Sequence, residues 1–552
     1  MKRTLCMLLC LVLCIGLLAG CGGSKTDAPA TSGNDTKPTE APDTSGGKGE
    51  AGLINTGSGS VAGSTATPPP KEAEYYDELS LFIGDKVAII DPMNPGANTS
   101  QTGIIDHQAY DTLVYYTIDG TYEPCLATEW SANDDATVWT FKLRDDVTFH
   151  NGEHFTSDDV VFTVEKCMEN PGNYVSNSFG QVEKCVAKGD YEVEFTLKAG
   201  NFDFIFDCAT PVAVIVNREA YESGDEHAGW IGTGPYKIVD MVPNDSITYE
   251  RFDDYWGEKG LTKKFTMRYI AEETARLIML ENDEVTFCGL GSVYIPQYAN
   301  DERFVINSYV MNNCNYVAFN TRKEITGDKN FRLACAYALD RNELLDIALD
   351  GYGAVADTGG YWGFKTPYKN RDIPCWEQDL DKAKEYLAQS CYNGEKIYIT
   401  AGMAHTIRTA QVVQAQLQAI GIDCEVKQLD GPSMNSATQY DNNQEDIVVG
   451  SGAWTLANSI KNFTTPGNNS NKACYENQEV IDLVAKAAAT PDGPERQEIY
   501  YKIQEIMHDD LPYYPTFHMG LYTAAQKGAG GAIYFPSNYH DYGAAYRLKN
   551  PE

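Results

Sequence analysis

The sequence is poor in basic residues. Its 552 residues include 43 Lys and Arg against 78 Asp and Glu, which gives a formal net charge of −35 at pH 7. Such an acidic chain does not offer the basic face that binds nucleic acid or an anionic membrane surface. We therefore expect no nucleic-acid partner and no membrane binding through a charged face.

Motifs of catalysis and of structural metal sites are also missing. The sequence contains no HExxH and no GxSxG, the local patterns of zinc hydrolases and of hydrolase nucleophiles. It has no CxxC pair, which argues against a structural zinc site, and no repeat of 20 to 50 residues, which excludes solenoids and propellers. An exported hydrolase is thus the least favoured class. We expect a protein that is not an enzyme and that has no cofactor and no metal site.

Cysteine pairing is not indicated either. Of the 15 cysteines, four lie within the first 21 residues, so 11 remain in the rest of the chain, and an odd number cannot all pair. Cys335 and Cys424 fall on apolar positions and are expected to be small core residues. One or two disulfides stay open as an alternative, because exported proteins can form them.

The first residues have the pattern of an export signal. Met1–Arg3 is basic, and the apolar run that follows, 5–20, is shorter than the roughly 20 residues with which a helix spans a bilayer. The run ends in Leu-Ala-Gly before Cys21, which resembles the bacterial lipoprotein signal. We expect residues 1–20 to be a lipoprotein signal peptide and Cys21 to carry lipid. The alternative is an ordinary signal peptide in which Cys21 has no role.

Residues 21–75 follow as a segment of Gly, Ser, Thr, Pro, Ala and Asp with almost no large apolar side chain. Such a composition predicts a disordered tether. A flexible tether of about 50 residues has a root-mean-square reach on the order of 40 Å. We therefore expect a body anchored by lipid at the extracellular face of the cytoplasmic membrane, in a bacterium with a single membrane.

Two histidines four residues apart, His150 and His154, raise the question of a metal site. On one helix, this spacing would aim both rings at one ion, but Asn151-Gly152 lies between them and favours a tight turn. The segment 147–156 is therefore predicted to be a hairpin rather than a metal site. Thr156 and the acids that follow it then cap a helix that runs to about Met168.

Strands and helices are mixed along the body. TVWTFKL (137–143) and YEVEFTL (191–197) alternate apolar and polar side chains, as half-buried strands do. Further on, a strand at 396–400, a helix over 405–419 and a strand at 422–426 predict a βαβ unit with a parallel strand pair. The expected helix has Ile407, Val413 and Leu417 toward the core and Gly421 as its stop. The expected class is α/β in more than one lobe.

One long segment then resembles a known family. PCLATEWSANDDATVWTFKLRDDVTFHNGEHFTSDDV, residues 124–160, is similar to the pattern P-x-LA-x-x-W … F-x-LR-x-x-V-x-F-H-x-G-x-x-x-T-x-x-DV of the family 5 extracellular solute-binding proteins. Further blocks match in the family's order: GTGPYKI (232–238), FDDYWG (252–257), FRLACAYALDR (331–341), DLDKAKEYL (379–387) and 495–515. We therefore identify the chain as a member of this family, whose known members bind oligopeptides, dipeptides or nickel.

The resemblance implies a two-lobe fold like that of type II periplasmic binding proteins, with an enlarged first lobe and a hinged cleft. On this basis lobe I takes residues 76–319 and 513–552, and lobe II takes residues 320–512. The two chain crossings are expected near Asn320 and near Pro512. The protein is expected to be a monomer.

The family also implies a function, which is capture of a solute between the lobes and delivery to the permease and ATPase of an ABC transporter. A short peptide is the first expected ligand, with a nickel–metallophore complex, an opine, a sugar or another small metabolite as alternatives. A surface sensor on the same fold is a second alternative.

Ligand contacts are expected from loops at the ends of strands. From the resemblance they are Asn98 and Gln101 in lobe I, and Tyr361, Trp362, Trp454 and Asn458 in lobe II. Peptide-binding members carry an aspartate shortly after the tryptophan that corresponds to Trp454, where it pairs with the ligand's ammonium group. The segment 455–460 has no acid, so a peptide ligand rests on family membership alone.

Overall fold

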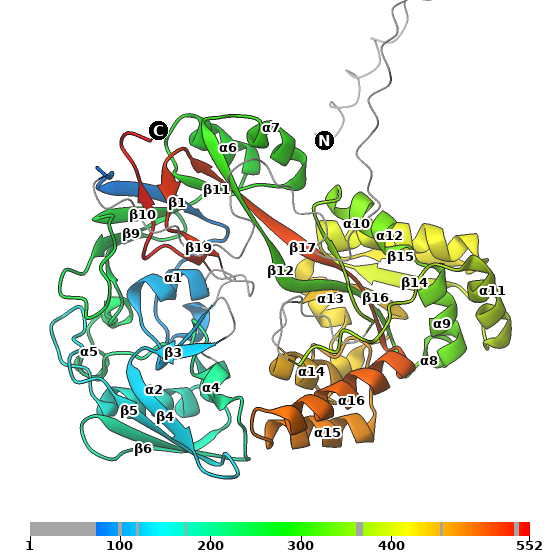
Figure 1. Ribbon diagram of the computed structural model, residues 1–552, viewed down its shortest axis with the longest axis horizontal. Coiled ribbons are helices and arrows are strands. Elements are labelled where there is room, and N and C mark those ends of the chain that lie inside the picture. The colour runs from blue at the N-terminus through cyan, green and yellow to red at the C-terminus, as the bar shows by residue number, and fades with distance from the viewer. Residues whose placement is uncertain are drawn as a thin grey trace, which may run out of the picture. The chain divides into compact units, whose positions relative to one another are not determined.

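Strands and helices alternate along the described part of the chain, in the mixed α/β arrangement that the sequence predicts (Figure 1). The computed structural model describes residues 73–97, 102–117, 121–171, 173, 175–359, 368–452, 456–534 and 540–551. All of them belong to the compact unit Glu50–Glu552. No helix within these residues is both long enough and apolar enough to cross a membrane.

Two four-stranded sheets are built from the first half of the chain. The first has the order β1-β10-β9-β8 and consists of β1 (Glu78–Ile83), β10 (Lys264–Tyr269), β9 (Ser246–Arg251) and β8 (Tyr236–Val242), with β1 parallel to β10. The second has the order β4-β5-β7-β6 and consists of β4 (Ala127–Ala132), β5 (Val138–Leu143), β7 (Glu192–Leu197) and β6 (Val182–Ala187). β5 and β7 are the two strands that the alternating pattern predicts, and they pair antiparallel.

A seven-stranded sheet joins segments that are far apart in the sequence. Its order is β11 (Phe287–Gly289), β17 (Tyr513–Gln526), β12 (Phe304–Phe319), β16 (Ile447–Gly452), β14 (Ile397–Ala401) and β15 (Cys424–Gln428), and β13 (Gly353–Val355) also pairs with β17. The long strands β12 and β17 run antiparallel, and their register shifts between Val310 and Tyr316. Figure 1 shows them running together from the N-terminal half toward the helices of the C-terminal half.

The remaining elements are short strands and helices. The small pairs are β2 (Val114–Tyr116) with β3 (Tyr122–Pro124), β18 (Ala529–Gly530) with β21 (Tyr546–Arg547), and β19 (Ile533–Tyr534) with β20 (His540–Asp541). Helices before β12 are α1 (Thr102–Ala109), α2 (Ser157–Glu169), α3 (Ser176–Phe179), α4 (Phe204–Asp207), α5 (Arg218–Ser223), α6 (Glu273–Glu281) and α7 (Ile295–Ala299), and 3-10 turns are η1 (Pro95–Ala97), η2 (Ala228–Trp230) and η3 (Ser292–Tyr294).

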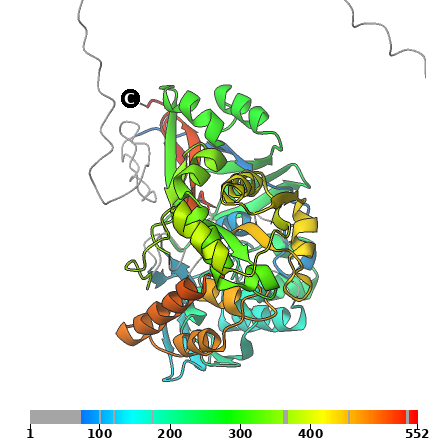
Figure 2. The same cartoon turned by 90° about the vertical axis from the view of Figure 1, so that its right-hand side faces the viewer.

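Helices of the C-terminal half cover the seven-stranded sheet. They are α8 (Glu324–Gly327), α9 (Lys329–Ala338), α10 (Arg341–Leu349), α11 (Leu380–Gln389), α12 (Ala404–Ala419), α13 (Gly431–Ala437), α14 (Leu456–Thr464), α15 (Gln478–Ala488) and α16 (Pro494–Asp510), with the 3-10 turn η4 (Tyr440–Asn442). Figure 2 shows α15 and α16, in orange, packed together below the yellow-green helices.

The βαβ unit is confirmed. β14 and β15 pair in parallel, and α12 connects them over Ala404–Ala419. Val413 and Leu417 are fully buried, while Ile407 packs against the same core from a partly buried position. Gly421 has φ +97°, a left-handed conformation that ends a helix with little strain in glycine.

The hairpin predicted for residues 147–156, around the two histidines, is also confirmed. Thr148 and His154 form an antiparallel bridge, and Gly152 in the turn has φ +91°. Thr156 then caps α2, where the Asp159 carboxylate accepts a hydrogen bond of 2.9 Å from the Thr156 backbone N–H. The capping therefore begins this helix at the predicted residue.

Buried apolar side chains form four clusters. The first core draws on residues 79–309 and on a few residues beyond 310, such as Ala525 and Tyr542. The second core, 317–517, and the third core, 314–513, flank the seven-stranded sheet. A fourth, smaller core includes residues 277–304 with Tyr522 and Ala524. The N-terminal half and the last part of the chain thus share cores, and the residues between them form two others.

The cysteines of the described residues are all free, and most are buried. Cys335 and Cys424 have 0% and 2% exposure and belong to the second core, as their apolar sequence positions predict. No disulfide is present among the eleven described cysteines.

Candidate functional site

The ligand residues expected from the resemblance cannot be placed. Asn98, Gln101, Tyr361, Trp362 and Trp454, together with the lipidation site Cys21, lie outside the described residues. Asn458 is in α14, but its side chain is likewise outside the described part. Their roles stay predictions, and the described residues that flank them define the candidate site.

Two helices and a short strand, α9, α10 and β13, precede the segment with the expected ligand residues Tyr361 and Trp362. The FRLACAYALDR block, residues 331–341, covers most of α9 and ends at the first residue of α10. α9 ends at Ala338, and Asp340 caps α10, where its carboxylate accepts hydrogen bonds from the N–H groups of Asn342 (2.9 Å) and Glu343 (3.3 Å). Strand β13 follows, so Gly359 comes after an edge segment that pairs with β17.

The end of β16 contacts both long strands. The Ser451 hydroxyl donates a hydrogen bond of 2.6 Å to the side-chain oxygen of Asn313 on β12 and lies 3.9 Å from the sulfur of Met519 on β17. Ser451 directly precedes the segment with Trp454. The predicted lobe II loop therefore starts where β16 meets the middle of β12 and β17.

Charged side chains gather beside these strands. Asp357, Lys369, Arg371 and His518 form what we call the Lys369 cluster. The Asp357 carboxylate pairs with both the Lys369 ammonium and the Arg371 guanidinium. His518 lies opposite Ala354 on β13 and, on its other side, opposite Cys314 on β12.

The exposed fraction of the charged side chains increases across the Lys369 cluster. The Lys369 side chain is 1% exposed, that of Asp357 is 34% exposed and that of Arg371 is 58% exposed. With a neutral His518, the cluster has two cations and one anion. It can therefore offer an excess positive charge to an anionic group, although the chain as a whole is strongly acidic.

The pKa shifts in the cluster follow from burial and from these charges. Burial alone would raise the pKa of the Asp357 carboxyl, but Lys369 and Arg371 outweigh it and hold that pKa below its usual value. Burial lowers the pKa of Lys369 despite the carboxylate beside it. Burial and the Lys369 ammonium lower the pKa of His518 to about 3. His518 is therefore neutral at pH 7.

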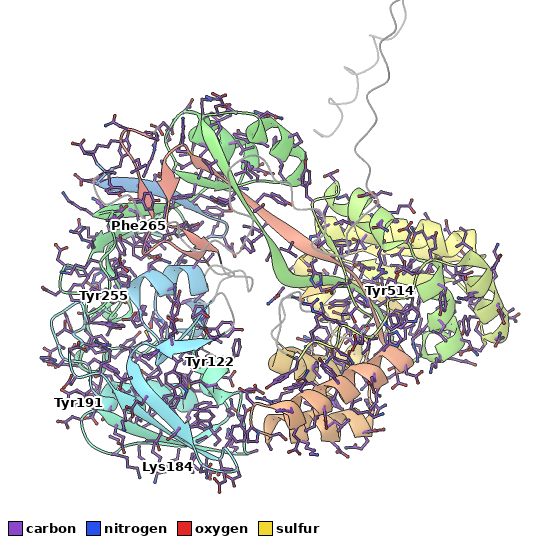
Figure 3. All side chains as sticks on the ribbon, in the orientation of Figure 1. Tyr122, Lys184, Tyr191, Tyr255, Phe265 and Tyr514 are labelled. Atoms are coloured by element: carbon purple, nitrogen blue, oxygen red, sulfur yellow. The ribbon has the colours of Figure 1, made fainter. Side chains whose placement is uncertain are left out.

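Aromatic side chains form a second feature in the N-terminal half. Tyr116 and Tyr122 are register partners on β2 and β3, with ring centroids 5.4 Å apart, and Phe206 meets Tyr116 edge-on at 5.3 Å. All three are partly buried, and we call them the aromatic ledge. Figure 3 labels Tyr122, on the side of the N-terminal half that faces α14 and α16. Aromatic rings in such a position can pack against an apolar or planar group.

The histidine pair of the hairpin has a structural role. The His150 Nδ1 accepts a hydrogen bond of 3.3 Å from the Gly232 N–H, so Nε2 carries the proton and donates to the Gly234 carbonyl at 2.9 Å. Burial lowers the pKa of His150 to about 4. His154 is exposed. Within the described residues, no group of three His, Cys, Asp or Glu side chains is placed to hold a metal ion.

Sequence reasoning missed the Lys369 cluster and the aromatic ledge. Lys369 and Arg371 lie between blocks that resemble the family, and no periodic pattern marks them. The nearest signal is the cluster's place a few residues beyond the expected loop at 359–362. His518 is separated from Lys369 by almost 150 positions, so only the pairing of β13, β12 and β17 brings them together.

Comparisons with known proteins agree with this picture. Residues 121–472 match the family described as bacterial extracellular solute-binding proteins, family 5 Middle. The nickel-binding periplasmic protein of Escherichia coli (strain K12) is 25% identical over 488 residues, which cover 81% of this chain and 90% of that protein. The glutathione-binding protein GsiB of the same strain is 26% identical over 484 residues, which cover 83% of this chain and 92% of that protein.

A solved structure shows the same fold. The ABC transporter substrate-binding protein CtaP from Listeria monocytogenes superposes with a TM-score of 0.76 at 25% identity, over 86% of this chain and 100% of that chain. The likeness confirms the predicted fold class, an α/β protein with the two lobes of the periplasmic binding proteins. Since the family match spans more than half of the sequence, the chain belongs to the bacterial extracellular solute-binding proteins, family 5.

Proposed function

We propose that the protein is the solute-binding lipoprotein of an ABC importer and that it captures a small carboxylated solute, in the first place a short peptide, for delivery to a membrane permease. Family membership supports solute capture without chemical conversion. The names of two relatives, a nickel-binding and a glutathione-binding protein, set the range of ligands to test. Glutathione is itself a small peptide with two carboxylates.

The division into lobes is part of this proposal. Lobe I takes residues 76–319 and 513–552, and lobe II takes residues 320–512. The distribution of the cores supports it, since the first and fourth cores combine the N-terminal half with residues after 520, while the second and third lie within 314–517. The second and third cores also include residues within 314–319 and 513–517, so we propose that the crossings lie in the middle parts of β12 and β17 and that both boundaries shift by a few residues from those near Asn320 and Pro512.

The hinge of this proposal lies in those two strands. Their register shifts between Val310 and Tyr316, so the regular ladder is interrupted where the cores change. An irregular pair of strands bends more easily than a continuous one. A solute that touches both lobes would stabilise the closed form by its difference in affinity for closed over open.

The Lys369 cluster is the single observation that carries the choice of a carboxylated ligand. Its outermost member, Arg371, has a side chain that is 58% exposed and pairs with Asp357. A guanidinium is a favoured partner of carboxylates, because its planar fork of N–H groups matches their geometry. The cluster stands next to β13 and to the end of β16, from which the predicted ligand loops start. We place the ligand's carboxylate there.

A solute screen tests this function. The mature protein is purified, compounds that co-purify with it are identified by mass spectrometry, and its melting temperature is measured with glutathione, dipeptides, a nickel–histidine complex and neutral sugars. A ligand that binds only the native state at 100 times its Kd stabilises it by about 2.7 kcal/mol. We expect peptides and glutathione to raise the melting temperature and neutral sugars to leave it unchanged. A shift with sugars alone, or turnover of any compound, would contradict the proposal.

Uptake distinguishes an importer from a sensor on the same fold. A strain that lacks this gene is compared with its parent for accumulation of the labelled compound that gave the largest shift. We expect accumulation to fall and to return when the gene is restored. Normal accumulation together with a lost transcriptional response would favour the sensor.

A further inference from the structure

An ion pair joins two segments that belong to different cores. The Arg496 guanidinium, in the first turn of α16, pairs with the carboxylate of Asp203, which directly precedes α4. The two residues are 293 positions apart. The Arg496 side chain is 3% exposed and that of Asp203 is 19% exposed. Such a pair is shielded from solvent, so its attraction is screened less by water and salt than that of a surface pair.

A backbone hydrogen bond lies beside the ion pair. The Phe202 N–H donates to the carbonyl of Ala488 at 2.8 Å. Ala488 is the last residue of α15, and carbonyls at a helix end lack partners within the helix. A backbone N–H of the N-terminal half thus provides a hydrogen-bond donor for a carbonyl at a helix end of the C-terminal half. We call these two interactions, Asp203–Arg496 and Phe202–Ala488, the clasp.

The N-terminal side of the clasp is held by its own half. The Trp139 indole N–H donates to the Asn201 carbonyl at 3.2 Å, and the Asn201 amide donates to Gln181 at 2.7 Å. Phe202 packs against the first core. The loop that carries Asp203 is therefore fixed without help from α16.

The C-terminal side is fixed in the same way. Arg496 also pairs with Asp492 at 2.7 Å, and Asp492 accepts a hydrogen bond of 2.9 Å from the Tyr368 hydroxyl. The rings of Tyr368 and Tyr500 stack at 5.6 Å, and Tyr500 belongs to the third core. Arg496 would therefore keep one carboxylate partner if the clasp opened.

Each side of the clasp is thus held in position by contacts within its own half. Figure 1 shows α4 facing the orange helices α15 and α16, well away from the long strands β12 and β17 that also connect the two halves. Burial raises the pKa of the Asp203 carboxyl even with the guanidinium beside it, as expected of a contact that excludes water. The aromatic ledge lies next to the clasp, since the charges of Asp203, Asp492 and Arg496 all affect the pKa of the Tyr122 hydroxyl.

We propose that the clasp is a latch between the two lobes, which holds the closed form at the side opposite the hinge and must break whenever the lobes open. This inference rests on the proposed function, because it assigns the two sides of the clasp to lobes I and II. It assigns Asp203 and Arg496 a role in retaining the solute without requiring that either touches it. Breaking the ion pair would shift the population toward the open form.

Hydrogen exchange of the mature, full-length protein without added solute tests the latch. In the wild type, the Phe202 amide is expected to exchange through a local opening, much faster than amides of β5 and β7, which need unfolding of the first core. If the Phe202 amide exchanges as slowly as those strands, the contact is part of the permanent packing and the inference is wrong. This measurement needs no variant.

Variants sharpen the test. Asp203→Asn keeps the shape and removes the charge, and we expect the Phe202 segment to exchange at least about tenfold faster, the effect of losing one charge-assisted hydrogen bond. Asp492→Asn removes the other partner of the same guanidinium, which lies within one half, and should not speed this exchange. Glu129→Gln breaks the exposed pair with Lys142 and controls for the loss of a charge. Equal exchange in Asp203→Asn and Glu129→Gln would overturn the inference.

Failure of the latch and failure of solute binding are separable. The exchange experiment is done without solute, so it reports on the clasp even if none of the screened compounds binds. Conversely, melting shifts with glutathione or peptides in the wild type would support solute binding even if Asp203→Asn leaves exchange unchanged.

Discussion

Asp111 shows how a buried carboxylate links two segments of the N-terminal half. Its side chain accepts hydrogen bonds from the Trp256 indole N–H at 2.9 Å and from the Tyr255 hydroxyl at 3.1 Å. Both donors belong to the FDDYWG block, and Figure 3 labels Tyr255. Burial raises the pKa of Asp111 to about 6, although these donors act to lower it. The block that resembles the family therefore has a structural role here.

This shift predicts a pH dependence of stability. Because the folded pKa lies above the unfolded one, the folded state binds the proton more tightly, so this contribution is present below about pH 4 and is lost as pH rises through 6. Asp111→Asn cannot titrate. We expect the wild-type free energy of unfolding, measured against that of the variant, to fall by up to about 3 kcal/mol from pH 4 to pH 7. Urea unfolding at four pH values measures this, and parallel pH profiles would contradict it.

Substitution of Arg371 tests the proposed contact with a ligand carboxylate. The Arg371 side chain is 58% exposed, so Arg371→Gln should leave the fold intact and remove a charged donor. We expect the Kd of glutathione, or of the peptide with the largest melting shift, to rise about tenfold or more in calorimetry. Arg303→Gln is the matched control, because Arg303 is similarly exposed and pairs with Asp301. Unchanged affinity in Arg371→Gln would remove it from the site.

At the scale of elements, local patterns predicted what local physics determines. The alternation in β5 and β7, the turn at Gly152 and the βαβ unit around α12 all follow from neighbouring residues. The Lys369 cluster and the clasp could not be predicted in this way. Lys369 lies near His518, and Asp203 pairs with Arg496, only after strands and helices from distant segments have packed. No short sequence pattern predicts such long-range contacts.

The GTGPY block packs closely against the end of α1. A Cβ added to Gly232 would lie 2.0 Å from the carbonyl oxygen of Ala109 at the end of α1. The Gly232 N–H also donates a hydrogen bond to the His150 Nδ1. We expect Gly232→Ala to lower the free energy of unfolding by about 3 kcal/mol or to prevent folding, because neither backbone can yield easily. Gly431→Ala, where an added Cβ meets nothing within 4 Å, should have little effect. Similar denaturation midpoints for both variants would contradict this.

At the scale of the whole molecule, the two-lobe arrangement came from a resemblance rather than from composition or periodicity. Those patterns establish an α/β class and a size sufficient for more than one core. They cannot show that β12 and β17 cross together from one set of cores to another, because this depends on the pairing of strands about 200 residues apart. A hinge at one side and a clasp at the other would give the protein two defined states, and solute binding would select between them.

The attachment of the molecule to its membrane is tested at Cys21, which lies outside the described residues. If its thiol carries the lipid, Cys21→Ser removes the anchor, since each buried methylene of an acyl chain contributes about 0.8 kcal/mol to membrane binding. We expect the variant to leave the membrane fraction and its N-terminal peptide to lose the mass of the lipid. Cys14→Ser, within the apolar run 5–20, is the matched control and should stay anchored. Lipid still attached to the Cys21→Ser variant would show that the anchor is at another residue. The predicted tether, residues 21–75, would then not begin at the anchored residue.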